Sequence, residues 1–122
     1  MPDKRQTGTR YEQEAAAYLI RQGYRILETN YRTRQGEIDL IASSPEGVLV
    51  MVEVKYRRPG TGFDPLEAVD VRKQRHLSHA AMWYLMSHDL PEDLVIRFDV
   101  IGCTGDGQIT HIKHAFDYKG RW

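Results

Sequence analysis

The feature that most constrains the fold is a pair of apolar runs within residues 36–58 that carry charged side chains in their interior. The sequence there reads GEIDLIASSPEGVLVMVEVKYRR, and a polar SSPEG turn separates the two runs. This pattern predicts two strands joined by a tight reversal. Charged groups inside apolar strands are costly unless they are paired or bind a metal ion, so their placement is the first indication of a functional site.

Three of these charged residues can meet. Side chains alternate along a strand, so Glu53 and Lys55 project from the face opposite to that of Val54. We expect Asp39 to lie beside them on the neighbouring strand. Asp39 and Glu53 would then supply two carboxylate ligands to Mg²⁺ or Mn²⁺, with the Val54 carbonyl or water completing the coordination shell.

Such a cluster has the chemistry to hydrolyse a phosphodiester. Lys55 would orient or help to deprotonate an attacking water, or stabilise charge on a phosphate. Glu12, on the inward side of a predicted helix, would reach the same site as a ligand or by holding a metal-bound water. Structural alternatives stay open: an E-x-K pair is often a surface ion pair, and Glu37 shares a strand face with Asp39 and would pair with Arg34 or Lys55.

The remaining sequence predicts one α/β domain over residues 1–122, with residues 1–8 flexible. We expect helices from about Thr9 to Gln22 and over 65–88, and strands over 24–31, 94–102 and 108–115. The resulting order is αβββαββ. A parallel crossover through the second helix would make the central sheet mixed, with helices on its two faces.

Composition limits the class of protein. The chain has 17 basic and 17 acidic residues, and zero net charge argues against a strongly basic nucleic-acid binder. A local basic face remains open, because many Arg and Lys residues precede residue 76, among them Arg32, Arg34, Arg57 and Lys73. A single cysteine, the lack of a long apolar run and an N-terminus without a signal-peptide core predict a soluble cytoplasmic protein without a membrane partner.

Other motifs favour structural roles. Arg97 and Asp99 share a strand face and are expected to form a structural ion pair. No two histidines sit with a third ligand at zinc-like spacing, and Cys103 has no context of a nucleophile.

Four segments together resemble a known family. They are GEIDLIA, VEVKYR, the helical pattern EAV-x₃-K-x₂-HL-x₂-AA-x₂-YL, and RFDVI. The chain is similar over roughly residues 9–102 to the YraN-like family of predicted endonucleases, related to archaeal Holliday junction resolvases. The resemblance implies a restriction-endonuclease-like (tRNA endonuclease-like) three-layer fold with a PD-(D/E)xK nuclease core.

The resemblance also implies roles for individual residues. The catalytic Asp falls on Asp39, the acid and the lysine of the (D/E)xK motif on Glu53 and Lys55, and the acid of the first helix on Glu12. Lys73 matches the family's lysine of the second helix, and we expect it either to contact phosphate or to be simply exposed. The family usually has Gly before the helix acid, where this chain has Tyr11, and we expect the tyrosine to narrow the approach to the site.

These observations define two classes of function. The first is a Mg²⁺- or Mn²⁺-dependent endonuclease acting on DNA, branched or damaged, and forming a homodimer as the resolvases do. The second is a non-catalytic nucleic-acid-binding protein that keeps the nuclease fold. A purely structural role for the acidic cluster, paired with nearby arginines, is the third alternative.

Overall fold

A computed structural model of the chain describes residues 4–60, 62, 64–91 and 93–119. Five strands form one sheet in the order β1-β2-β3-β4-β5. They are β1 (Arg25–Arg32), β2 (Glu37–Ser43), β3 (Leu49–Arg57), β4 (Ile96–Thr104) and β5 (Ile109–Phe116). All neighbours are antiparallel except β3 and β4, which are parallel. The predicted mixed sheet and parallel crossover are therefore confirmed.

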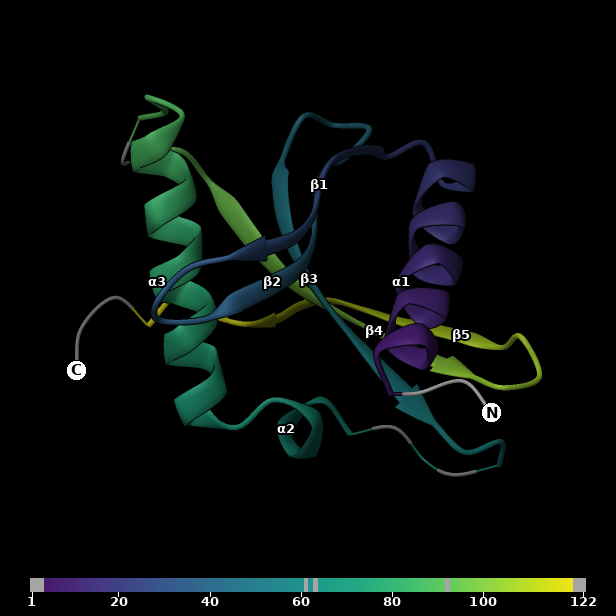
Figure 1. Cartoon of the computed structure of the whole chain (residues 1–122). Coiled ribbons are helices and arrows are strands. Elements are labelled where there is room, and N and C mark those ends of the chain that lie inside the picture. Colours follow the sequence, from purple (N-terminus) through teal and green to yellow (C-terminus); the bar gives the residue numbers. More distant parts are fainter. Residues whose placement is uncertain (1–3, 61, 63, 92, 120–122) are drawn as a thin grey trace.

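Helices cover both faces of this sheet, as Figure 1 shows. Helix α1 (Lys4–Arg21) lies on one face, and α3 (Val71–Ser87) lies on the other after the short helix α2 (Pro65–Ala68). The α/β layers and the order αβββαββ agree with the prediction. Among the described residues, no helix is both long enough and apolar enough to cross a membrane.

Two helix boundaries differ from those predicted. Helix α1 begins at Lys4, so residues 4–8 are helical where flexibility was expected; residues 1–3 lie outside the described part. Lys4, Arg5, Gln6 and Arg10 are good helix formers, and the helix extends backward through them despite the weaker Thr7, Gly8 and Thr9. The long helix predicted over 65–88 is divided, because the Asp70 carboxylate accepts a hydrogen bond of 2.8 Å from the Lys73 N–H and caps a new helix.

Each face of the sheet has its own apolar core. The core under α1 includes Ala15 and Leu19 of the helix, and the core under α3 includes Leu77 and Leu85. Valines of β3 pack toward α1, whereas Leu49 and Met51 pack toward α3. Since β3 contributes to both cores, its position is fixed from both sides.

The sheet opens between β2 and β3. These strands pair only from Leu40–Ser43 of β2 to Leu49–Val52 of β3, whereas β3 pairs with β4 along its whole length. From Glu53 onward, β3 therefore lacks a β2 partner. The β1–β2 turn lies against α3 instead: a Cβ added at Gly36 would be 2.9 Å from the His76 carbonyl oxygen. This divergence positions the candidate site.

Candidate active site

Asp39 lies where β2 leaves β3. Its Oδ2 accepts a hydrogen bond of 2.8 Å from the Val54 N–H. The flanking residues Ile38 and Leu40 pack into opposite cores, so the strand alternation changes at Asp39. The carboxylate thus replaces a backbone acceptor that a continuous β2 would have provided. Because the N–H and C=O of one strand residue point to the same side, the Val54 carbonyl also faces this opening.

Glu53 brings a second carboxylate to Asp39, from the buried part of β3. Its side chain is only 6% exposed. Burial, followed by the adjacent Asp39 carboxyl, raises the pKa of Glu53 to about 8, although Lys73 and Lys55 oppose the rise. Among the described residues, Glu53 Oε2 has no hydrogen-bond donor, since the Lys73 ammonium at 3.4 Å is near enough for an ion pair but not aligned for a hydrogen bond. The two carboxyls therefore lack sufficient compensating positive charge.

Two lysines face this pair of acids. Lys55 follows Glu53 by two residues on β3, is partly buried, and lowers the Glu53 pKa by its charge. Lys73, in the first turn of α3, makes the ion pair with Glu53. The sequence placed Lys73 on phosphate or at an exposed position; its contact with Glu53 was not foreseen, because it depends on how α3 docks.

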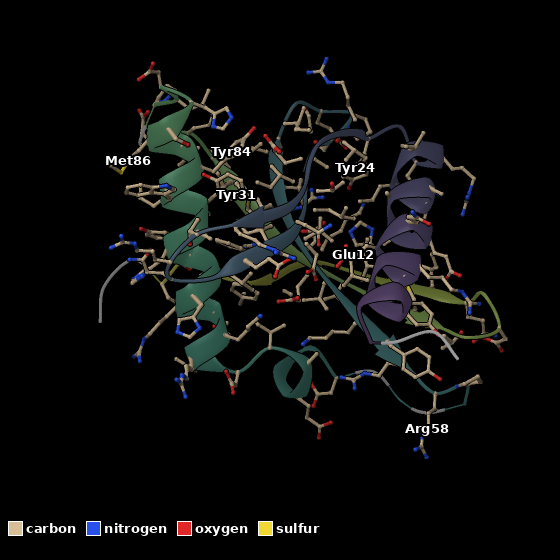
Figure 2. The ribbon with its side chains drawn as sticks, in the orientation of Figure 1. Glu12, Tyr24, Tyr31, Arg58, Tyr84 and Met86 are labelled. Carbon is tan, nitrogen blue, oxygen red and sulfur yellow. The ribbon has the colours of Figure 1, made fainter. Side chains whose placement is uncertain are left out.

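Glu12 approaches Asp39 from α1. Burial and then the charge of Asp39 raise the pKa of Glu12, whereas a hydrogen bond with Asn30 opposes the rise. Glu12, Asn30 and Leu40 line a pocket of about 180 Å³. Figure 2 shows Glu12 between α1 and the sheet. The structure therefore brings Glu12, Asp39 and Glu53 into one cluster, in which Asp39 raises the pKa of both Glu12 and Glu53.

Two expectations about neighbouring residues were wrong. Tyr11 is 8% exposed and packs in the core under α1, with its ring centroid 4.9 Å from that of Tyr56, so it does not stand at the rim of the site. Glu37 pairs with Arg32 at 3.6 Å, rather than with Arg34 or Lys55, because the two residues are directly opposite in the β1–β2 register.

The basic residues named from the sequence lie on separate elements of the fold. Arg32 is on β1 and Arg34 is exposed in the turn that follows. Arg57 is at the end of β3, where it lines a pocket of about 290 Å³ with Gly102 and Thr104 of β4.

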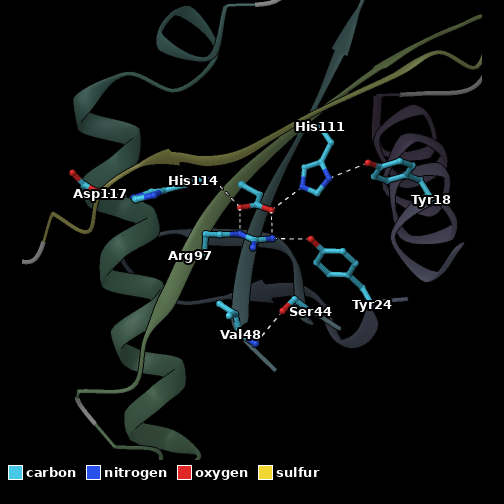
Figure 3. A network of polar contacts seen from close by, with 9 residues as sticks. Tyr18, Tyr24, Ser44, Val48, Arg97, His111, His114 and Asp117 are labelled. Carbon is cyan, nitrogen blue, oxygen red and sulfur yellow. Dashed lines mark hydrogen bonds and ion pairs between the residues drawn. The ribbon is translucent and has the colours of Figure 1, made fainter. Parts of the chain in front are cut away.

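A second buried carboxylate belongs to a polar network under α1 (Figure 3). Asp99 accepts hydrogen bonds from Arg97 Nε and Nη2 at 2.8 and 2.9 Å, from His111 Nε2 at 2.7 Å and from the His114 N–H at 3.1 Å. His111 Nδ1 in turn contacts the Tyr18 hydroxyl at 3.0 Å. The predicted Arg97–Asp99 pair is confirmed, and His111 is the partner that the sequence did not reveal.

The residues at the opening fit a hard divalent cation. Mg²⁺ binds through one or two carboxylates and keeps several waters, and the site offers Asp39, the under-compensated Glu53 and the Val54 carbonyl. In the described part of the chain, no group of three or more His, Cys, Asp or Glu side chains is arranged to hold a metal ion. Cys103 is a poor ligand as well, since burial raises the pKa of its thiol to about 11.

The fold and site define an α/β protein whose mixed sheet opens at a pair of buried carboxylates. Sequence comparison gives the family: the chain belongs to UPF0102, described as an uncharacterised protein family, whose model matches residues 11–103. This confirms the YraN-like resemblance.

Relatives cover nearly the whole chain. A UPF0102 protein of Lachnoclostridium phytofermentans is 46% identical over 97% of this chain and 98% of its own length. A UPF0102 protein of Coxiella burnetii is 42% identical over 92% of each chain, and one of Persephonella marina is 42% identical over 90% of this chain and 92% of its own.

Proposed function

We propose that this protein is a Mg²⁺- or Mn²⁺-dependent endonuclease that hydrolyses phosphodiester bonds in DNA, branched or damaged. The observation that carries the proposal is the contact between Asp39 and Glu53 at the opening of the sheet. Burial and mutual repulsion raise the pKa of Glu53 to about 8, so the site gains most from a ligand that brings positive charge. A divalent cation bound there would polarise a phosphate and lower the pKa of a bound water.

The protein would hold this cation with few side chains. Asp39 and Glu53 would bind it, and Asp39 is oriented by the hydrogen bond from the Val54 N–H. The Val54 carbonyl faces the same opening and would add a neutral oxygen ligand. Glu12, half-buried next to Asp39, would accept a hydrogen bond from a water on the α1 side.

The lysines would serve the phosphate and the water. Lys55 is on the same face of β3 as Glu53 and would orient the attacking water or stabilise charge that develops on phosphate oxygens. Lys73 is attracted to Glu53 at present. Once the carboxylates are neutralised, this attraction weakens, and its ammonium would be available to a phosphate. Arg32, Arg34 and Arg57 would contact the DNA backbone on either side.

Cleavage assays test this proposal. Linear, nicked and four-way DNA would be incubated with Mg²⁺ or Mn²⁺ and wild type, Asp39→Asn, Lys55→Ala or the control Asp93→Asn, whose side chain is exposed. We expect cleavage by wild type and control, and a loss of at least about 10²-fold in both site variants. Absence of cleavage on every substrate, or equal rates in all variants, would contradict the proposal.

A non-catalytic nucleic-acid-binding protein is the second candidate, and the Lys73–Glu53 ion pair favours it. If this pair persists in solution with divalent ions present, the acids serve structure alone. Lys73→Met would then weaken binding to DNA and would not change the affinity for the metal ion. Under the endonuclease proposal, Lys73→Met strengthens metal binding because a competing cation is removed.

The nuclease would act in the cytoplasm. It would act as a homodimer, because a branched substrate presents two strands to cut. Sedimentation equilibrium of the purified protein, alone and with a four-way junction, tests the oligomeric state. A monomer in both conditions would contradict the proposed homodimer.

A further inference from the structure

The end of β3 carries an exposed aromatic ring, Tyr56, on the α1 face of the sheet, whereas the Glu53 and Lys55 side chains project from the other face. Tyr56 is 47% exposed, although it follows Lys55 directly and belongs to a strand otherwise largely buried. Counted from Glu53, it is three residues along β3, so the two Cα atoms are about 10 Å apart. A large ring left in water at this distance from the carboxylates needs an explanation.

The ring is held in place from below. Its centroid is 4.9 Å from that of Tyr11, with an angle of 33° between the ring planes. Tyr11 is itself fixed in the core under α1, where its carbonyl oxygen lies 3.8 Å from Cys103 Sγ and the Arg10 guanidinium lies 5.5 Å from its ring. Tyr56 therefore rests on a buried ring and keeps exposed surface for a ligand. Ordering it on binding costs little conformational entropy.

Two arginines accompany the exposed ring. Tyr56, Arg57, Arg58 and Glu67 contribute to one pocket of about 360 Å³. This volume is in the usual range for a small-ligand site. Figure 2 shows Arg58 beyond the end of β3. A planar ring beside two guanidinium groups matches a nucleotide, because the ring offers a face for the base and the cations attract its phosphate.

We propose that Tyr56 is a stacking platform for an unpaired nucleotide of the bound DNA. Bases inside a duplex stack on their neighbours and cannot lie against a protein ring unless they are unstacked. The platform therefore selects nucleic acid with a single-stranded portion, as at a flap, a gap or an open junction. This inference rests on the proposed endonuclease function and specifies its substrate class.

Binding without cleavage tests the platform separately from catalysis. Single-stranded DNA oligonucleotides with one 2-aminopurine, moved through successive positions, would be titrated with protein in EDTA. We expect wild type to bind and to quench 2-aminopurine at one or two adjacent positions. Tyr56→Phe should behave as wild type, and Tyr56→Leu, which still covers Tyr11, should bind about 5- to 100-fold more weakly without quenching.

Two controls make the result specific. Tyr118→Leu removes another exposed tyrosine, 41% accessible and outside this pocket, and should leave binding and quenching unchanged. Fully paired DNA should bind wild type and Tyr56→Leu with equal affinity. Circular dichroism melting would show that Tyr56→Leu is folded at the assay temperature.

The outcomes separate this inference from the proposed function. Wild type that binds no single strand, Tyr56→Leu that binds and quenches like wild type, or an equal loss on paired DNA would each overturn the platform. Asp39→Asn should still bind and quench in EDTA, since it retains Tyr56. Quenching by Asp39→Asn and wild type without metal-dependent cleavage by wild type would leave the platform standing and reject the endonuclease.

Discussion

Asp99 and Glu53 are buried carboxylates on two neighbouring strands, yet their surroundings have opposite effects on their ionisation. The Asp99 side chain is 0% exposed and that of Glu53 is 6% exposed. Burial raises the pKa of either acid. At Asp99, hydrogen bonds from His111, Arg97 and the His114 N–H outweigh burial and hold the pKa below its ordinary value. At Glu53, the neighbouring Asp39 adds to the effect of burial, and the pKa rises to about 8.

The difference separates a structural from a functional cluster. The protein satisfies Asp99 with its own donors, and the hydrogen bonds to this carboxylate, together with its charge, raise the pKa of Arg97. The pair of Glu53 and Asp39 has fewer donors than its charge requires. Unfavourable electrostatics that the fold retains are characteristic of sites that await a ligand. The two clusters therefore make opposite predictions for the same kind of substitution.

The largest effect is expected from removing the charge of Asp99. In Asp99→Asn, the Arg97 guanidinium and the His111 ring lose a buried anion, and breaking a buried ion pair costs about 3–5 kcal/mol. Urea denaturation at pH 7 should show this loss in the free energy of unfolding. Asp93→Asn, at an exposed position, should change it little. A loss below about 1 kcal/mol in Asp99→Asn would show that the network contributes no net stability.

Removing the charge of Glu53 should have the opposite effect and raise the free energy of unfolding at alkaline pH. Since the Glu53 pKa is raised from 4.5 to about 8, the folded protein binds the proton more tightly, and this contribution to stability is full below pH 4.5 and lost as pH rises through 8. Metal-free wild type should lose about 2–4 kcal/mol over this window, and Glu53→Gln should be more stable than wild type at pH 8.5.

Urea denaturation in EDTA at several pH values measures this slope. Asp99 has the opposite pH dependence, because its pKa is lowered in the folded protein. Its contribution to the free energy of unfolding is present above the ordinary pKa of 3.8 and is lost as pH falls through the folded-state pKa. The stability of wild type should thus decline on both sides of an acidic optimum. A flat profile between pH 5 and 8 in wild type would contradict the raised Glu53 pKa.

Sequence reasoning identified the components of the candidate site better than their contacts. The alternation along β3 placed Glu53 and Lys55 on one face, and the charge of Lys55 does act on Glu53, although the ion pair of Glu53 is with Lys73. It also brought Asp39 to the adjacent strand. The site of divergence between β2 and β3 was not predictable, since it depends on Asp39 replacing a backbone acceptor at Val54.

The network around Asp99 shows another limit. Arg97 could be assigned from its position two residues before Asp99 on one strand. His111 comes from β5, where the register shifts opposite Asp99 and His114 has a positive φ of 53°. Such an irregularity leaves no periodic signal, so His111 could not be matched to Asp99 in advance. The alternation of side chains along one strand can be predicted from a sequence, whereas the register between strands depends on the folded sheet.

Divalent ions should reduce the contrast between the two clusters. At a hundred times its dissociation constant, Mg²⁺ or Mn²⁺ would raise the free energy of unfolding by about 2.7 kcal/mol. The apparent affinity should increase from pH 6 to pH 8, because the Glu53 proton competes with the ion. Isothermal titration and thermal melting measure both effects. Glu53→Gln should lose them and Asp93→Asn should keep them; equal stabilisation of all three proteins would place the ion elsewhere.

The smallest effect tests whether the Asp99 network extends to α1. His111 Nε2 faces a carboxylate and therefore donates, so a neutral ring has Nδ1 as an acceptor for the Tyr18 hydroxyl at 3.0 Å. Tyr18→Phe leaves this buried nitrogen without its donor and should cost about 1 kcal/mol in urea denaturation. Tyr118→Phe, with an exposed ring, should cost nothing measurable. If Tyr18→Phe were neutral, water would satisfy Nδ1 equally well, and the compensated cluster would end at His111. Tyr18→Phe should instead lower the free energy of unfolding measurably, whereas Glu53→Gln should raise it. This contrast would show that even the outermost hydrogen bond of the Asp99 network stabilises the fold, while the charge of Glu53 does not.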